Sequence, residues 1–549
     1  MTRRAELEPV SRDEMTSVGT LWPPALDQRL EPVIRVLMTA CAFAVIASWA
    51  LLAAAHIQDR YLVAAGLPGQ ALQGGNASVW MAQARAANLG QSYPDLYDRQ
   101  AFGGTRYAPL PIWMWAVTER VTGDYLVAGK VAAYTVGIAL LGLAFVTMRR
   151  LSGSIPMALL LASTILVSLP GLVATTGTLR GDALPLLLQL AAVAVIARST
   201  DARACALAGA LCALALTSKL SAGWAPIAIT IWLAIHARRR VAVFLGVLAV
   251  SVVVLFSVFQ AMSDGRMLEN FQATLFADTG GTGSLLAPLR LFQLLADAAE
   301  ATAILFPVAL VGLVIAAARR DATLYDLSVV CGLLVLTLVL ADGGAQANHL
   351  IDAIVLIPIA VAGFVGRLAR LPGASAARLA IAVVTLWAVG LSYGLYVQHD
   401  VRDAAASVVR RAAISTYDPQ PLRGHLRPGD TVLSEDPYVP LSIGEQPVVL
   451  DPWMLVILGG QHPDWPDSLA MRIARREFKA VILSQRLETS DPVYRHSVFG
   501  EQVLRAVCQH YRFADFVEGY WVYAPAAPAV GEPSLATADT QGPNACATR

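Results

Sequence analysis

The chain has 549 residues, of which 56% are hydrophobic and 15% are charged, and its formal net charge is +1 at pH 7. Soluble domains carry about 25% charged residues, so this composition excludes a water-soluble enzyme of this length. The mean hydropathy of +0.55 instead predicts a mainly α-helical, polytopic membrane protein, and no basic patch interleaved with aromatic residues predicts nucleic-acid binding.

The chain begins with a polar segment, 1–32, which predicts a cytoplasmic tail and lacks the order of a cleavable signal peptide. Apolar stretches of about 15–23 residues then recur, as a hydrocarbon core of roughly 30 Å requires. They predict about eleven membrane spans, near residues 33–55, 125–148, 156–175, 182–197, 204–218, 220–236, 241–262, 301–318, 325–341, 350–366 and 377–397.

Arginine placement predicts the topology of these spans. With the N-terminus inside, every short cytoplasmic connection is basic, as the positive-inside rule requires. The arginines concerned are Arg149, Arg150, Arg198, Arg203, Arg238, Arg239, Arg240, Arg319, Arg320, Arg367 and Arg370. The bias toward arginine over lysine is typical of GC-rich bacteria, so we expect a multi-pass protein of the bacterial inner membrane.

Three large segments are then expected on the outer side. The loop 56–124 is amphipathic, and Trp80, Trp113 and Trp115 predict an interfacial helix or two. The loop 263–300 is the second segment.

The third outer segment begins after the membrane domain, 33–397. Residues 398–523 predict a small extracytoplasmic α/β domain, because the runs "TVLSEDP", "PVVLD", "KAVILS" and "GYWVYAP" resemble strands and 464–478 resembles a helix. Residues 524–549 are rich in Ala, Pro, Gly and Thr and predict a disordered tail.

Polar residues gather at the predicted outer boundary of the membrane. Asp182 lies in "TGTLRGDALP", Lys219 at the tip of a helical hairpin, and Asn348 and His349 in "GGAQANHLID". Polar groups at membrane depth are costly, so they predict a vestibule for a lipid-linked phosphate, with cations neutralising it and carboxylates accepting a hydroxyl proton. Structural roles stay open, because Asp182 could cap the next helix, and Asn348 and His349 could cap or bridge helices.

Three stretches, in this order, resemble the glycosyltransferase C superfamily. They are "GGNASVWMAQARAANLGQSYPDLYDRQAFGGTRYAPLPIWMW", then "LRGDALPLLLQLAAV", then "GGAQANHLIDA" with the later "VLSEDPYVPLSIGEQPVVLDPWM". The likeness covers most of residues 33–523 and is greatest to the bacterial branch related to protein O-mannosyltransferases and the lipid A aminoarabinose transferase. The order of the motifs is more specific than any one of them.

The resemblance implies a transferase that moves a sugar, with inversion, from a polyprenyl-phosphate donor to an envelope glycan, glycolipid or protein. Family members use a first-loop carboxylate as the general base, but that position is Asn76 here, and an amide cannot accept the proton. Asp98 is the replacement that we predict, with Asp59 and Asp95 as alternatives.

The other site residues follow from the same resemblance. Asp182 matches the second acidic motif of the family. The implied substrate-binding residues are Arg180, beside the phosphate, and Tyr107, Lys219, Asn348 and His349, lining the site. Many family members use a divalent cation, but no cluster of His, Cys or carboxylate residues in this chain has the spacing of metal ligands.

Two other functions stay open. A transporter or lipid flippase would move its substrate without bond chemistry, and internal repeats with broken helices in matching halves would favour it. No such symmetry is apparent, and a soluble domain on the outer side argues against it. A non-catalytic relative that binds polyprenyl lipid is the other possibility, and Asn76 is the residue that favours it.

Overall fold

The computed structural model describes residues 76–98, 100–168, 181–275, 286–341, 347–370, 426–490, 492–517 and 520–526, with Val36, Ala40 and Leu422 as single residues. The first and last expected spans, 33–55 and 377–397, and both terminal tails lie outside these residues.

Nine of the expected spans contain a helix. These helices are α4 (Tyr125–Ser152), α5 (Ile155–Val167), α7 (Ala183–Arg198), α8 (Ala202–Ser218), α9 (Trp224–His236), α10 (Arg238–Met262), α13 (Glu300–Arg319), α14 (Leu324–Leu340) and α15 (Ile351–Ala369). Four apolar segments, in α4, α10, α13 and the 3-10 helix η4 (Ala347–Leu350) joined to α15, are long enough to cross a membrane, and the other five are shorter apolar helices. The prediction of a mainly helical, multi-pass membrane protein is confirmed.

Local signals in the sequence set the ends of these helices. Asp124, Ser154 and Asp201 each accept a backbone N–H in the first turn of the helix that follows, α4, α5 and α8, which satisfies a donor that the helix leaves open. Gly153 ends α4 in the left-handed conformation, which glycine adopts at little cost. The helix boundaries therefore depend mainly on neighbouring residues.

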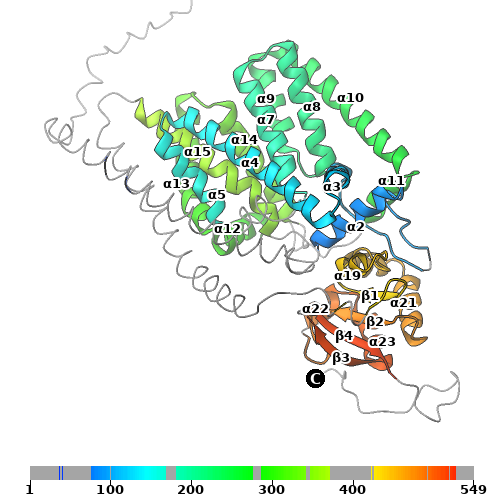
Figure 1. The fold of residues 1–549 in the computed structure, drawn as a ribbon. Coiled ribbons are helices and arrows are strands. Elements are labelled where there is room, and N and C mark those ends of the chain that lie inside the picture. The colour runs from blue at the N-terminus through cyan, green and yellow to red at the C-terminus, as the bar shows by residue number, and fades with distance from the viewer. Residues whose placement is uncertain are drawn as a thin grey trace, which may run out of the picture.

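Helix α15 forms the centre of the bundle. In its apolar segment, 83% of the residues are buried, against 6% in α10. Helix α15 packs against α4, α5, α13 and α14, whereas α10 packs mainly against α8 at the edge of the bundle (Figure 1). Because a lipid-facing helix keeps its apolar side chains exposed in the absence of lipid, α10 has the character of a lipid-facing helix and α15 that of a core helix.

Arg367 near the end of α15 differs from the other arginines that predict the cytoplasmic loops. Its guanidinium forms two hydrogen bonds to Asp326 of α14, at 2.8 and 3.0 Å, and both side chains are 6% exposed. It also donates to the carbonyl of Gly312 in α13, at 3.4 Å. Arg367 thus joins three helices instead of flanking a loop.

The first loop, expected on the outer side, contains two helices, α2 (Asn76–Asn88) and α3 (Pro109–Thr122), and the loop 263–300 contains α11 (Arg266–Leu275) and α12 (Ala287–Ala298). Two of the three expected interfacial tryptophans are not at the surface of the first loop, whereas Trp113 is half-buried. Trp80 is 4% exposed and Trp115 is fully buried. Tertiary packing of α2 and α3 against the bundle removes both rings from any water–lipid boundary.

Residues 432–525 form a four-stranded sheet with helices, which we call the C-terminal unit. The strands are β1 (Val432–Ser434), β2 (Ala480–Leu483), β3 (Tyr511–Val517) and β4 (Tyr520–Pro525), in the order β1-β2-β4-β3. β1 and β2 are parallel, and the other two pairs are antiparallel. The helices of this unit are α19 (Tyr438–Ser442), α20 (Pro452–Gly459), α21 (Asp464–Ala474), α22 (Pro492–Ser497), α23 (Glu501–His510) and the short 3-10 helix η6 (Leu487–Thr489).

Three of the four strand-like runs coincide with β1, β2 and β4, and the expected helix from 464 is α21. The run "PVVLD" is not a strand of the sheet. Its Val449 instead forms an isolated bridge with Phe102 of the first loop, through hydrogen bonds of 2.7 and 2.8 Å. Figure 1 shows α2 between the helical bundle and the C-terminal unit.

Asp451 is a buried carboxyl group of the C-terminal unit, and its ionisation affects the pH dependence of stability. It caps α20 through Oδ1, while its buried Oδ2 accepts no hydrogen bond within the described residues. Burial raises the pKa of this carboxyl above its ordinary value of 3.8, although the charge of Arg106 opposes the shift. The folded state therefore binds the proton more tightly than the unfolded state, and stability falls as the pH rises through the interval between the two pKa values.

We therefore expect Asp451→Asn, which keeps the cap, to gain stability over the wild type as the pH rises. The difference in Tm should be larger at pH 7 than at pH 3, which lies below the ordinary pKa of the carboxyl, in scanning fluorimetry of the full chain. Asp124→Asn, at an exposed N-cap, is the matched control, with the same difference at both pH values. A difference for Asp451→Asn that shrinks with rising pH would contradict the assignment.

Candidate functional site

Asp182 and Lys219 form an ion pair where two consecutive helices meet. Asp182 directly precedes α7, and Lys219 is the residue after α8. The two helices pack side by side, which brings the start of one next to the end of the other. Lys219 Nζ donates to Asp182 Oδ1 at 2.8 Å, with the side chains 19% and 10% exposed. A charge pair so little exposed is desolvated, which makes each charge strongly dependent on the other.

The side chain of Asp182 does not cap α7. Its backbone is already helical, with φ −107° and ψ −54°, and its carboxylate accepts no hydrogen bond from the first turn. Asp201 at the start of α8 has extended backbone and does cap its helix. The structure thus excludes a helix cap as the role of the Asp182 side chain, because the carboxylate is directed to Lys219 and not to the backbone of α7.

Residues from two further segments surround this pair. Asn348 of η4 donates from Nδ2 to both carboxylate oxygens of Asp182, at 3.5 Å each. Asp352 in the first turn of α15 accepts a hydrogen bond of 3.0 Å from Trp224 Nε1. Asp352 interacts electrostatically with the charges of both Lys219 and Asp182. We call Asp182, Lys219, Asn348 and Asp352 the polar centre.

The first loop forms a wall beside the polar centre. Trp80 of α2 lies against Gly181, the residue before Asp182. The ring of Tyr107 packs on Trp80, with centroids 4.4 Å apart. The Trp80 ring therefore lies between Tyr107 and Gly181. The sequence predicted Trp80 at the membrane surface and not in this wall.

The structure does not bring all the expected site residues together. Asp98 is exposed, and its Oδ1 accepts the backbone N–H groups of Gln100 and Ala101, at 2.8 and 2.6 Å. Such bonds stabilise a turn, and the neighbouring Tyr97 stacks on Trp465 of the C-terminal unit. A catalytic role for Asp98 stays a prediction.

The remaining expected residues divide as follows. His349 is half-buried on η4 beside Asn348, and Asp95 is 62% exposed, 3.6 Å from Arg266. Asn76 is the first residue of α2, but its side chain lies outside the described part. Arg180 and Asp59 lie outside it altogether.

The described residues do not favour a bound cation. No group of three or more His, Cys, Asp or Glu residues among them could hold a metal ion. The carboxylate of Asp182 is already compensated by Lys219. We therefore derive no chemical step through a metal.

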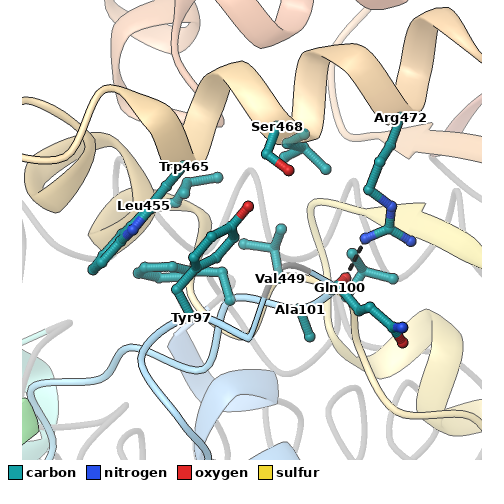
Figure 2. Close-up of a pocket in the computed structure, with 11 residues that line it drawn as sticks. Tyr97, Gln100, Ala101, Val449, Leu455, Trp465, Ser468 and Arg472 are labelled. Atoms are coloured by element: carbon teal, nitrogen blue, oxygen red, sulfur yellow. Dashed lines mark hydrogen bonds between the residues drawn. The ribbon is translucent and has the colours of Figure 1, made fainter.

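A small cleft lies between the first loop and the C-terminal unit. Figure 2 shows Tyr97 beside Trp465, and Arg472 donating to the backbone carbonyl of Gln100. Its volume of about 20 Å³ holds little more than one water molecule. This cleft is therefore a packed contact that holds the first loop on α21, and the polar centre is the candidate site.

The fold of the chain is similar to that of two solved structures. The apo structure of ArnT from Cupriavidus metallidurans has a TM-score of 0.56 and 14% identity, over 87% of this chain and 98% of that one. The structure of the same protein bound to undecaprenyl phosphate has a TM-score of 0.54 and 15% identity, over 89% and 99% of the two chains. No family model and no curated protein matches the sequence.

Proposed function

We propose that this chain is a membrane glycosyltransferase of the glycosyltransferase C type, which moves a sugar from a polyprenyl-phosphate donor to an acceptor of the cell envelope. The observation that carries the proposal is the little-exposed pair of Asp182 and Lys219 at one end of the bundle. It occurs in a fold similar to that of a protein that binds undecaprenyl phosphate. A lipid donor can stay in the bilayer while its headgroup reaches such a helix end.

The residues of the polar centre suit an inverting displacement. An acceptor hydroxyl would attack the anomeric carbon as its bond to the phosphate oxygen breaks, and the lipid phosphate would leave as an anion. Asp182 would take the proton of that hydroxyl. Lys219 has three N–H donors, so it can keep Asp182 and also bind the phosphate. Asn348 would hold the carboxylate in place, with Arg180, Tyr107 and His349 lining the substrates.

The same proposal includes the topology. Asp182 and Arg198 lie at opposite ends of α7, about 24 Å apart along the helix. This separation supports a polar centre at the outer face of the inner membrane, if the arginine-rich side is cytoplasmic. Cys508 of the C-terminal unit is disulfide-bonded, which suits an oxidising outer compartment. We propose eleven spans within 33–397, a cytoplasmic N-terminus and an outer domain over 398–523.

The test is a transfer assay in membranes that contain the overexpressed chain. Radiolabelled polyprenyl-phosphate hexoses and pentoses are supplied with envelope extract as the acceptor, and membranes without the chain are the control. We expect label to enter a glycan, glycolipid or protein fraction, with release of polyprenyl phosphate. Binding or transbilayer movement of these lipids with no transfer from any sugar would overturn the proposal in favour of a lipid-moving or non-catalytic protein.

A further inference from the structure

Trp80 occupies a defined place between the first loop and the polar centre. The ring is 4% exposed. A Cβ atom at Gly181 would lie 3.0 and 3.1 Å from the Cη2 and Cζ2 atoms of Trp80, and 3.4 Å from the carbonyl oxygen of Ser218. Gly181 therefore fills a narrow space between the Trp80 ring and the end of α8, and a larger residue there requires one of them to move.

This space adjoins both members of the ion pair. Gly181 is followed by Asp182, and Ser218 is followed by Lys219. The Trp80 ring thus backs the point where the start of α7 meets the end of α8. A shift of the ring changes the separation of these two backbone segments, and with it the 2.8 Å contact of Asp182 with Lys219.

The helix that carries Trp80 is anchored on the C-terminal unit. Arg85 of α2 donates to the carbonyls of Leu441 and Gly444, at 3.2 and 2.5 Å. Ser78 hydrogen-bonds the buried carboxylate of Asp436. Helix α2 is therefore in contact with the C-terminal unit through one part of its surface and with Gly181 through Trp80.

We propose that Trp80 is a positioning residue, whose ring sets the geometry of the Asp182–Lys219 pair and transmits the placement of the C-terminal unit to it. The expected change in kcat rests on the proposed function, whereas the expected displacement of the Asp182–Lys219 pair does not. The Trp80 ring packs against the backbone that carries Asp182 and Lys219. Loss of the ring therefore displaces these two side chains.

A compensating pair of substitutions tests the proposal. Gly181→Ala places a methyl group against Cη2 and Cζ2 of Trp80, and Trp80→Phe removes those two atoms. We expect each single variant to lower kcat on the order of 10-fold, since small displacements of reacting groups are costly, with the donor KM nearly unchanged. The double variant should recover to within about 3-fold of the wild type, which is a strongly non-additive cycle.

The chain offers a matched control in another buried pair. A Cβ atom at Gly129 of α4 would lie 2.2 Å from Cζ2 of Trp115 of α3, and neither residue is part of the polar centre. Gly129→Ala should lower the Tm of the full chain while kcat per folded molecule stays the same. An equal loss of kcat in this control would show that Gly181→Ala acts by general destabilisation, and the proposal would fail.

Hydrogen exchange of the full chain in detergent provides a measurement that needs no sugar transfer. The N–H of Lys219 donates to the carbonyl of Ala215 at 3.0 Å. Peptides covering 181–189 and 215–222 should exchange faster in each single variant and return to the wild-type rate in the double variant. That recovery would support the positioning role even if the wild type transfers no sugar, in which case only the proposed function fails. Additive exchange rates in the double variant would overturn the positioning role itself.

Discussion

Replacing Asp182 with asparagine is expected to lower sugar transfer by about 10²- to 10⁴-fold, the range that a general base contributes. Asparagine has nearly the same shape, but its amide accepts no proton and cannot balance the charge of Lys219. Helix α7 loses no cap, because the Asp182 carboxylate does not bond to its first turn. The measurement is the initial rate of label transfer, normalised to the folded protein in each membrane preparation.

Asp201→Asn is the control for this substitution. Asp201 caps α8 at the end of the hairpin opposite Lys219, and asparagine caps a helix as well as aspartate does. Its rate should equal that of the wild type. If Asp182→Asn stays within a few-fold of the wild type and Asp98→Asn is inactive, the base is Asp98, and the polar centre serves only in binding.

Removing either member of the buried pair in α14 and α15 is expected to destabilise the fold by about 3–5 kcal/mol. Asp326→Asn leaves the Arg367 guanidinium without a countercharge, and Arg367→Met leaves the Asp326 carboxylate without one. Both side chains are only 6% exposed. An unpaired charge in such surroundings is far costlier than the loss of the contact alone. The effect should be large because α15 is the most buried helix of the bundle. The midpoint of SDS-induced unfolding in mixed micelles measures it.

Two further variants complete this experiment. The double variant Asp326→Asn/Arg367→Met should be more stable than either single variant, because no uncompensated charge remains. Arg319→Met removes an exposed arginine from the last turn of α13 and should change the midpoint little. Single-variant losses below about 1 kcal/mol, the value of an exposed ion pair, would contradict the description of this pair as buried and structurally required.

The sequence by itself determined the helices and most of the sheet. Hydropathy over about 20 residues is a local property that directly reports a spanning or buried helix, and nine expected spans contain helices. The short strand-like runs punctuated by Pro, Gly and Asp predicted β1, β2 and β4, which is also a local signal. β3 was not anticipated, because its interior residues are exposed. Its pairing with β4 alone defines it as a strand.

Tertiary structure decided which polar residues meet. The topology predicted from the sequence puts Asp182, Lys219 and Asn348 at one boundary of the membrane, but only the packing of α7, α8 and η4 selected an ion pair over a helix cap. Arg367 had the sequence signature of a loop arginine, and its burial depends on Asp326 of another helix.

The first loop shows the same division between local and long-range effects. Tyr107 packs on Trp80 beside Gly181, whereas Asp98, nine residues earlier in the same loop, lies near the C-terminal unit. Helix formation follows from contacts between near neighbours in the chain. Charge pairing and ring packing depend on contacts between residues far apart in the chain, and these exist only once the helices have packed.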